Sequence, residues 1–385
     1  MEFEITGKER LWETFRSLTA IDSPSLGERR LCDWLKDRLR ELGVDCYEDG
    51  AGDIIGGNCG NLYGFLPGGA GDPILLSAHM DTVEPSSGKK AILREDGVIT
   101  SAGDTVLGAD DAAGIAVILE AIRRINESGA PRRPIELLFP VAEEVFGLGS
   151  ETADYSRIKA KEAYVLDLSG PVGEAANAAP TLMAFTIDIH GKAAHAGFAP
   201  QDGIHAIAAA ARAVARIPMG EIKPGLCCNI GTIAGGRARN IIPENCRVTG
   251  EIRSLSHNGA LLLWEEVKAV FKEEAAAIGA VAAIKKDVAL SAYETPLNSL
   301  TVRRFRKACA EEGVACAIHS TMGGSDNNNF ELHGIEGLVI ACSMNDVHSV
   351  REYCDLNELE KCARLVSRLI TGVDQDEDSI AVPTD

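Results

Sequence analysis

The stretch Pro73-Ile-Leu-Leu-Ser-Ala-His79-Met-Asp81 places a run of apolar residues directly before a histidine and an aspartate. A short continuous apolar run of this kind is typical of a strand that is buried on both faces, as in a parallel sheet. Its carboxyl end carries His79 and Asp81, and α/β proteins place their functional sites at that end of the strands. The sequence therefore predicts a parallel sheet with chemistry at one edge.

Helical and strand patterns alternate on both sides of this stretch. The predicted neighbours in the first part of the chain are helices at 8–20, 27–42 and 112–127 and strands at 44–47, 61–66, 135–141 and 163–168. The same pattern returns later, with helices at 300–311 and 356–369 and a strand at 337–341. Strands separated by helices predict an α/β fold with helices flanking a mostly parallel sheet.

The pattern changes between residues 178 and 291. The elements predicted there are a strand around 182–189, a helix at 204–217, strands at 227–233 and 247–253, a helix at 260–278 and a strand at 281–288. This β-α-β-β-α-β order is that of a small ferredoxin-like α+β unit. We therefore predict one domain formed by residues 1–177 and 292–385, interrupted by an inserted domain at 178–291.

The composition excludes several classes of protein. The 385 residues include 38 basic and 57 acidic side chains, and the resulting net charge of −19 argues against nucleic acid or anionic membranes as partners. No apolar run approaches the roughly 18 residues that span a bilayer. The 11 cysteines are an odd number without regular spacing, which favours reduced thiols and a cytoplasmic location over a disulfide framework.

Two clusters of candidate ligands lie near the opening strand. His79 and Asp81 share one face of an extended chain, so that the carboxylate of Asp81 can orient the imidazole of His79. Asp110 and Asp111 open the helix predicted at 112–127, where the helix dipole favours negative charge. Helix capping by itself would explain one of these two aspartates.

Three further clusters follow the predicted strands. Glu143 and Glu144 come directly after the strand at 135–141, and Asp167 ends the apolar run at 163–168. A carboxylate in such a run is costly to bury unless it is paired or bound to a metal. His348 follows the strand at 337–341.

Together these positions supply the donors of a metal centre. The candidate ligands are His79, Asp110, Glu144, Asp167 and His348. Two imidazoles and three carboxylates suit two divalent ions, with one carboxylate bridging them. Nitrogen and oxygen donors without thiolate favour zinc, with cobalt or manganese possible. In such a two-metal site a bridging water becomes a nucleophile at neutral pH, and an adjacent glutamate can act on it.

Several motifs, in order along nearly the whole chain, resemble the dinuclear zinc peptidase family of peptidase T, aminoacylase and glutamate carboxypeptidase. They are Ser77-Ala-His-Met-Asp-Thr-Val83, Leu107-Gly-Ala-Asp-Asp-Ala-Ala-Gly-Ile115, Pro140-Val-Ala-Glu-Glu-Val145, Val165-Leu-Asp167, His190-Gly-Lys-Ala-Ala-His-Ala-Gly197, Asn240-Ile-Ile-Pro243, Gly250-Glu-Ile-Arg-Ser254, Gly323-Gly-Ser-Asp326 and His348. The branch that the chain most resembles is that of peptidase T.

This resemblance implies a role for each ligand. His79 and Asp167 would bind one zinc ion, Glu144 and His348 the other, and Asp110 would bridge the two. Asp81 would orient His79, and Glu143 would be the general base. The resemblance also implies a cis peptide bond between Asp110 and Asp111.

The inserted block resembles the lid and dimerisation domain of the same family, and the family's catalytic domain has a zinc-exopeptidase-like fold. In the family, a histidine at the position of His195 reaches the site of the partner subunit in a homodimer. Asn240 and Arg253 resemble residues that hold the substrate, and Gly324 and Ser325 belong to a loop that would line the substrate pocket.

The resemblance predicts a metallopeptidase that cleaves short peptides, most simply an aminopeptidase of the tripeptidase type. An N-acyl amino acid deacylase or a carboxypeptidase on the same scaffold is the alternative, because the metal motifs do not separate these activities. The chain departs from the family pattern at Ala112, Met322 and Ser349, where peptidase T tends to carry Lys, Arg and Glu. These departures concern substrate preference rather than the metal ligands. A non-catalytic calcium-binding protein is disfavoured, because calcium prefers all-oxygen ligands.

Overall fold

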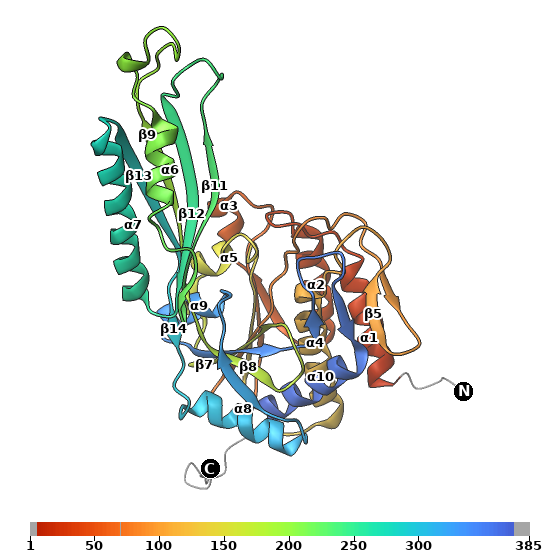
Figure 1. The fold of residues 1–385 in the computed structure, drawn as a ribbon. Helices are drawn as coiled ribbons and strands as arrows, with labels where there is room; N and C mark the ends of the chain where they lie inside the picture. The colour runs from red at the N-terminus through yellow and green to blue at the C-terminus, as the bar shows by residue number, and fades with distance from the viewer. Residues whose placement is uncertain (1–5, 70, 373–385) are drawn as a thin grey trace. The chain divides into compact units, whose positions relative to one another are not determined.

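The computed structural model describes residues 6–69 and 71–372, and the chain divides into two compact units (Figure 1). The first unit contains the chain up to Asn177, the segment Glu294–Ser320 and the chain from Ser325 onward. The second unit contains Ala178–Tyr293 and the short segment Thr321–Gly324. The first unit is therefore assembled from three separate stretches of sequence.

A nine-stranded sheet forms the centre of the first unit, in the order β1-β2-β6-β3-β7-β16-β8-β14, with β15 also paired to β8. The strands are β1 (Asp45–Glu48), β2 (Leu62–Leu66), β3 (Ile74–Ser77), β6 (Ile135–Phe139), β7 (Glu162–Leu168), β8 (Glu174–Ala179), β14 (Tyr293–Glu294), β15 (Ala317–Ser320) and β16 (Glu336–Ala341). The four neighbours β6, β3, β7 and β16 run parallel to one another. Their carboxyl ends consequently lie at the same edge of the sheet.

Side chains from successive residues of these strands enter two separate cores. On β3, Ile74 and Leu76 join one apolar cluster, whereas Leu75 joins another on the opposite face. The larger cluster is covered by α1 (Gly7–Thr19), α2 (Arg29–Glu41), α4 (Ala109–Ser128), α8 (Leu300–Glu311) and α10 (Leu356–Thr371). The smaller is covered by the short η1 (Tyr155–Arg157) and α9 (Asn327–Leu332). Burial on both faces explains why these strands are continuously apolar.

A second sheet in this unit carries one of the candidate ligands. Its four strands run in the order β17-β18-β5-β4, with bounds β4 (Ala91–Leu93), β5 (Val98–Ser101), β17 (Met344–Asn345) and β18 (Tyr353–Asp355). β17 and β18 pair in antiparallel fashion, so residues 346–352 form the loop of a hairpin. Two short helices, α3 (Ala51–Ile55) and α5 (Leu148–Glu151), complete the unit.

The second unit is a five-stranded sheet with two helices on one face (Figure 1). In chain order its elements are β9 (Thr181–His190), η2 (Pro200–Asp202), α6 (Ala206–Val214), β10 (Gly220–Lys223), β11 (Leu226–Gly235), β12 (Asn245–Ser254), α7 (His257–Ala277) and β13 (Val281–Leu290). The sheet order is β10-β11-β12-β9-β13. Alternate residues of β9, such as Ile187 and Ile189, pack against α6 and α7.

The predicted α/β class, with a large central sheet and flanking helices, is confirmed. The parallel part is limited to the centre, because β2 and β8 join their neighbours in antiparallel fashion. All eleven cysteines lie among the described residues and are free thiols, as the sequence predicts. Within residues 6–69 and 71–372, no helix is both long enough and apolar enough to cross a membrane.

Candidate metal centre

Polar side chains from five segments of the first unit meet beyond the carboxyl ends of its parallel strands. His79 and Asp81 follow β3, Glu143 and Glu144 follow β6, and Asp167 is the penultimate residue of β7. Asp110 lies at the start of α4, and His348 lies in the β17–β18 loop. The structure thus brings together residues that are up to 269 positions apart in the sequence (from 79 to 348).

Asp110 stands between the two imidazoles. Its Oδ1 lies 2.9 Å from Nε2 of His79, and its Oδ2 lies 3.1 Å from Nε2 of His348. Each oxygen of one carboxylate therefore faces a different histidine, which is the arrangement that a bridging ligand requires.

A second carboxylate accompanies each histidine. Asp167 Oδ1 lies 3.9 Å from His79 Nε2, and Glu144 Oε2 lies 3.0 Å from His348 Nε2. Donor atoms of His79, Asp111 and Asp167 lie within 4.8 Å of one another, and so do those of His79, Asp110 and Glu144. The donors form two overlapping groups that share His79.

The backbone at the start of α4 turns sharply to present these aspartates. Gly108 has a φ of 74°, a conformation that glycine adopts without steric cost, and the peptide bond between Asp110 and Asp111 is cis, as the resemblance implied. Asp111 accepts hydrogen bonds from the backbone N–H groups of His79 and Gly114. A Cβ at Gly114 would lie 2.4 Å from Asp111 Oδ1, so this glycine makes room for the aspartate.

His348 has a φ of 60°, in the left-handed region that side chains other than glycine rarely occupy. Neighbouring Asp346 is also left-handed, at 49°, and the Ser349 hydroxyl donates to the Asp346 carbonyl within the same tight loop. About half of the His348 side chain is exposed. One side of the centre is therefore accessible to solvent.

Asp81 is completely buried and organises its surroundings. Its Oδ1 lies 3.4 Å from His79 Nδ1 and accepts a hydrogen bond from Glu143 N. Its Oδ2 accepts from Glu144 N and from the Ser25 hydroxyl. Burial acts to raise the pKa of Asp81, but the hydrogen bonds from His79 and its other donors outweigh burial and lower the pKa. Asp81 is thus held as an anion facing His79.

The carboxylates also hold protons on the two imidazoles. Hydrogen bonds to Asp110 and Glu144 raise the pKa of His348 to about 10. Burial would lower the pKa of His79, but Asp110 and Asp81 outweigh it and raise the pKa well above its usual value. A divalent ion binds neutral imidazole and would take the place of these protons, so its binding would release protons.

The environment of Glu143 favours the protonated form of its carboxyl group, in contrast to that of Asp81. Burial raises its pKa well above the usual value, opposed by His79 and assisted by the nearby charges of Asp326, Glu144 and Asp81. A carboxylate with a raised pKa is the property expected of a general base that works near neutral pH.

The donor set fits divalent ions. Two imidazoles and several carboxylates converge, and among the described residues the ion pairs of Asp110 and Glu144 are made with the imidazoles alone. Glu144 Oε1 is buried and has no hydrogen-bond partner in the described part of the chain. An orphaned carboxylate oxygen is costly to bury unless a cation meets it.

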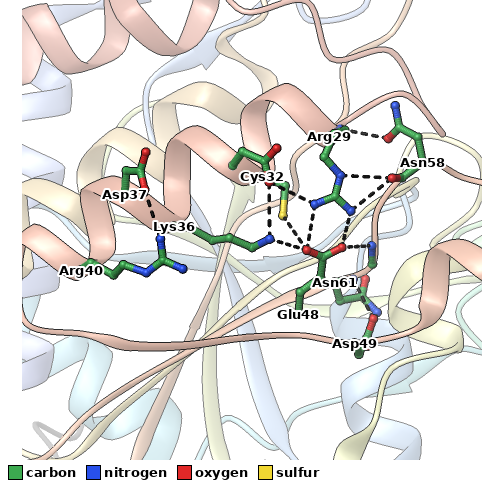
Figure 2. A network of polar contacts seen from close by, with 11 residues as sticks. Arg29, Cys32, Lys36, Asp37, Arg40, Glu48, Asp49, Asn58 and Asn61 are labelled. Carbon is green, nitrogen blue, oxygen red and sulfur yellow. Dashed lines mark hydrogen bonds and ion pairs between the residues drawn. The ribbon is translucent and has the colours of Figure 1, made fainter.

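A third close group, formed by Cys32, Asp33 and Glu48, lies elsewhere in this unit. Figure 2 shows the Glu48 carboxylate between Arg29 and Lys36, and it forms an ion pair with each of them. Gly60 N donates to Glu48 as well, at 3.0 Å. Because protein cations already neutralise these donors, we do not regard this group as a metal site.

Two of the predicted substrate-binding residues meet within the second unit. His195 forms an isolated antiparallel bridge with Ile241, and Ala196 N donates to the Asn240 carbonyl at 2.9 Å. Nδ1 of His195 accepts hydrogen bonds from Gly197 N and Phe198 N. In the neutral imidazole the proton therefore resides on Nε2, which can donate to a carbonyl oxygen.

Arg253 lies at the opposite end of β12 from the loop that carries Asn240. Asn245 and Arg253 are eight positions apart on β12, and at about 3.3 Å per residue the strand between them spans about 26 Å. Arg253 donates to the Met322 carbonyl and pairs with Glu251. The structure therefore does not place Arg253 beside Asn240 within this unit.

The two predicted loop residues differ in their surroundings. A Cβ at Gly324 would lie 2.3 Å from a methyl group of Leu290, which makes the glycine a requirement of packing. Ser325 is buried, and its hydroxyl accepts from Asn327 N.

Several buried acids around the centre were not among the predicted ligands. Asp326 is buried, and burial raises its pKa to about 6. Glu28 accepts from Ala142 N, which precedes the two glutamates, and burial raises its pKa to about 7. Glu352 accepts from Gly108 N and Asp110 N. Because Glu28 and Glu352 accept hydrogen bonds from the backbone of distant segments, no local spacing could reveal their roles.

A parallel sheet whose carboxyl edge gathers imidazoles and carboxylates into one centre defines an α/β enzyme of the metal-dependent class. The comparisons with known proteins identify its family. Residues 75–372 match the model of peptidase family M20/M25/M40, and the chain belongs to this family.

Three relatives cover almost the whole chain. The crystal structure of aminopeptidase PepT from Bacillus cereus is 36% identical, covers 95% of this chain and 98% of its own, and has a TM-score of 0.90. A tripeptidase from Staphylococcus aureus is 29% identical with a TM-score of 0.93, over 96% of this chain and 99% of its own. The uncharacterised protein YqjE of Bacillus subtilis is 36% identical over 95% of this chain and 99% of its own. The predicted resemblance to the peptidase T branch and the prediction of a peptidase are confirmed at this level.

Proposed function

We propose that the protein is a dinuclear, metal-dependent aminopeptidase that cleaves short peptides, of the tripeptidase or peptidase T-like type. The observation that carries the proposal is the position of Asp110, whose two oxygens lie 2.9 and 3.1 Å from two different imidazoles. The similarity to an aminopeptidase and a tripeptidase along nearly the whole chain supports the choice of substrate.

In this proposal His79 and Asp167 would hold one divalent ion, His348 and Glu144 would hold the other, and Asp110 would contribute to both. Zinc is the preferred metal because the donors are nitrogen and oxygen without thiolate, and cobalt or manganese are alternatives. Bound ions would supply Lewis acidity toward the scissile carbonyl and a water acidic enough to lose a proton near pH 7.

Glu143 is the proposed general base. Asp81 accepts a hydrogen bond from the Glu143 backbone, and thereby fixes the position of the loop that carries the glutamate. The Glu143 carboxylate takes a proton from the attacking water and then delivers it to the leaving amine. Its raised pKa allows it to hold that proton between the two steps.

The predicted substrate contacts belong to the second unit and extend the proposal. We propose that His195 polarises the substrate carbonyl through Nε2, and that Asn240, Arg253 and the Gly324–Ser325 loop bind the substrate. The two units would correspond to a catalytic domain and a lid and dimerisation domain. A cytoplasmic homodimer formed through the second unit completes the proposal, and sedimentation analysis tests the dimer.

Substrate selectivity, measured together with metal content, tests the function. We expect trialanine to be cleaved from its amino end, N-acetyl-trialanine to be refractory, and chelation to abolish turnover until zinc or cobalt is restored. Faster cleavage of N-acetyl-alanine would identify a deacylase instead, and release of the last residue from the blocked peptide would identify a carboxypeptidase. Full activity in a metal-free sample would exclude the proposed centre.

A further inference from the structure

Glu352 lies at the end of the hairpin loop that carries His348, four residues further along the chain. The residue is 1% exposed. Its backbone N–H donates to the Ser349 carbonyl, so its own position is fixed within the loop. The carboxylate is therefore an inward-facing, well-anchored part of the same short segment as His348.

This carboxylate reaches a distant segment through both of its oxygens. Oε2 accepts from Gly108 N at 2.7 Å, and Oε1 accepts from Asp110 N at 2.9 Å. These N–H groups belong to the turn that opens α4, where the backbone donors lack partners within the helix. Hydrogen bonds from N–H groups to a carboxylate are stronger and more directional than those between neutral groups.

The two hydrogen bonds tie together the two elements that face each other across the centre. One element presents Asp110 and the other presents His348, and their side chains lie 3.1 Å apart. The backbone of His348 is left-handed, which is unusual for a residue other than glycine, and that of Gly108 is left-handed as well. Glu352, which belongs to the loop, contacts the turn through both of its carboxylate oxygens and so can hold the two at a fixed separation.

We infer that Glu352 is a positioning residue that fixes Asp110 relative to His348 and thereby sets the affinity of the centre for divalent ions. The inference rests on the proposed function, because it assumes that Asp110 and His348 are ligands. Groups that orient metal ligands typically contribute 10- to 100-fold to metal affinity.

Glu352→Gln is the sharpest variant. The amide has nearly the same size and keeps one acceptor oxygen, but its NH₂ group would face a backbone N–H and cannot accept from it. Glu162→Gln is the matched control, because Glu162 is also buried but pairs with Arg133 at the other end of β7 from Asp167. The control removes a buried carboxylate of the same unit without touching the centre.

The experiment is a titration of the metal-free full-length protein with Co²⁺, followed by visible absorption, alongside chemical unfolding of the same metal-free samples. We expect Glu352→Gln to raise the Co²⁺ dissociation constant by about 10- to 100-fold and to alter the Co²⁺ spectrum. Glu162→Gln should lower stability but keep the wild-type constant and spectrum.

A Co²⁺ constant for Glu352→Gln within twofold of the wild type would overturn the inference, as would an equal loss in Glu162→Gln. If Glu352→Gln does not fold without metal, Glu352→Asp takes its place, because it keeps the charge on a side chain too short to reach both N–H groups. The same change in the Co²⁺ dissociation constant is then expected. Failure of the wild type to bind Co²⁺ would refute the proposed metal centre itself. If the wild type binds Co²⁺ and the variant has the same dissociation constant, only the role of Glu352 is refuted.

Discussion

Two groups of acidic side chains in the first unit bring their donor atoms equally close together, yet they meet different partners. At the candidate centre, donor atoms of His79, Asp110 and Glu144 lie within 4.8 Å, and the same limit holds for Cys32, Asp33 and Glu48. Around Glu48 the positive charge comes from Arg29 and Lys36 (Figure 2). At the centre it comes from two imidazoles that carry protons only because of the carboxylates themselves.

Proximity of ligand atoms therefore does not distinguish a metal site from an ion-pair network. The distinction lies in whether the protein supplies permanent cations. Arginine and lysine stay charged and cannot be ligands in that state, whereas histidine can exchange its proton for a metal ion. The Glu48 group is complete as it stands, and the centre is left with an orphaned oxygen on Glu144 among the described residues.

The largest expected contrast between the two groups is in catalysis. Glu143→Gln should lower kcat/KM for trialanine by about 10²- to 10⁴-fold, because it removes the base but no metal ligand. Glu48→Gln, in the other group, should leave kcat/KM unchanged. Steady-state kinetics with metal analysis of each sample measures both, and a Glu143→Gln enzyme with near-normal rate would remove Glu143 from its role.

The next contrast is in metal affinity, measured with a matched pair of aspartates. Asp167→Asn should weaken Zn²⁺ binding by more than about 100-fold, because a direct ligand contributes more than the groups that orient ligands. Asp33→Asn should have no effect, since Asp33 is 59% exposed and pairs with Arg29. Competition against a fluorescent chelator gives both constants. An equal loss in the two variants would mean that the Glu48 group also binds metal.

A smaller effect is expected on stability. Zn²⁺ at 100 times its dissociation constant should raise the free energy of unfolding by about 2.7 kcal/mol in the wild type. Asp110→Asn should lose this increment, whereas Glu48→Gln should keep it although its metal-free form is less stable. Urea unfolding of chelated and zinc-loaded samples provides the comparison. An increment that persists in Asp110→Asn would place the stabilising ion elsewhere.

Much of this comparison could be predicted from the sequence, because β3 and β6 are short apolar runs followed by His79 and Glu143, and Asp167 lies near the end of β7. Parallel strands bring their carboxyl ends to one edge, so the convergence of these side chains follows from the pattern. The sequence also predicts Asp110 at the start of a helix and His348 after a strand, but no pattern predicts that these two side chains meet. Their approach depends on a left-handed loop and on the unpredicted pairing of β17 with β18.

The elements that sequence reasoning missed have weak local signals. β8 has the sequence Glu-Ala-Ala-Asn-Ala-Ala, without the β-branched and aromatic residues that favour strands. α9 begins with three asparagines, which are poor helix formers. Both are specified by tertiary packing. The Glu48 network was missed for a similar reason, since Arg29 and Glu48 belong to separate elements.

The smallest expected effect concerns the response of the Glu48 group to acid. The hydrogen bond from Arg29 lowers the pKa of Glu48 from 4.5 to about 2. A depressed pKa contributes stability that is fully present above about pH 4.5 and is lost as the pH falls toward 2. Partial exposure and screening reduce the contribution to on the order of 1–3 kcal/mol.

The stability advantage of the wild type over Glu48→Gln should therefore be constant near pH 6 and shrink steadily below pH about 4.5. Urea unfolding of metal-free samples between about pH 3 and 6 measures it, and Glu95→Gln, at an exposed position, serves as the control. Parallel curves for the wild type and Glu48→Gln would mean that the pKa of Glu48 is the same in the folded and unfolded chains. The ion pairs with Arg29 and Lys36 would then contribute nothing, and the reason for excluding a metal from that group would be lost.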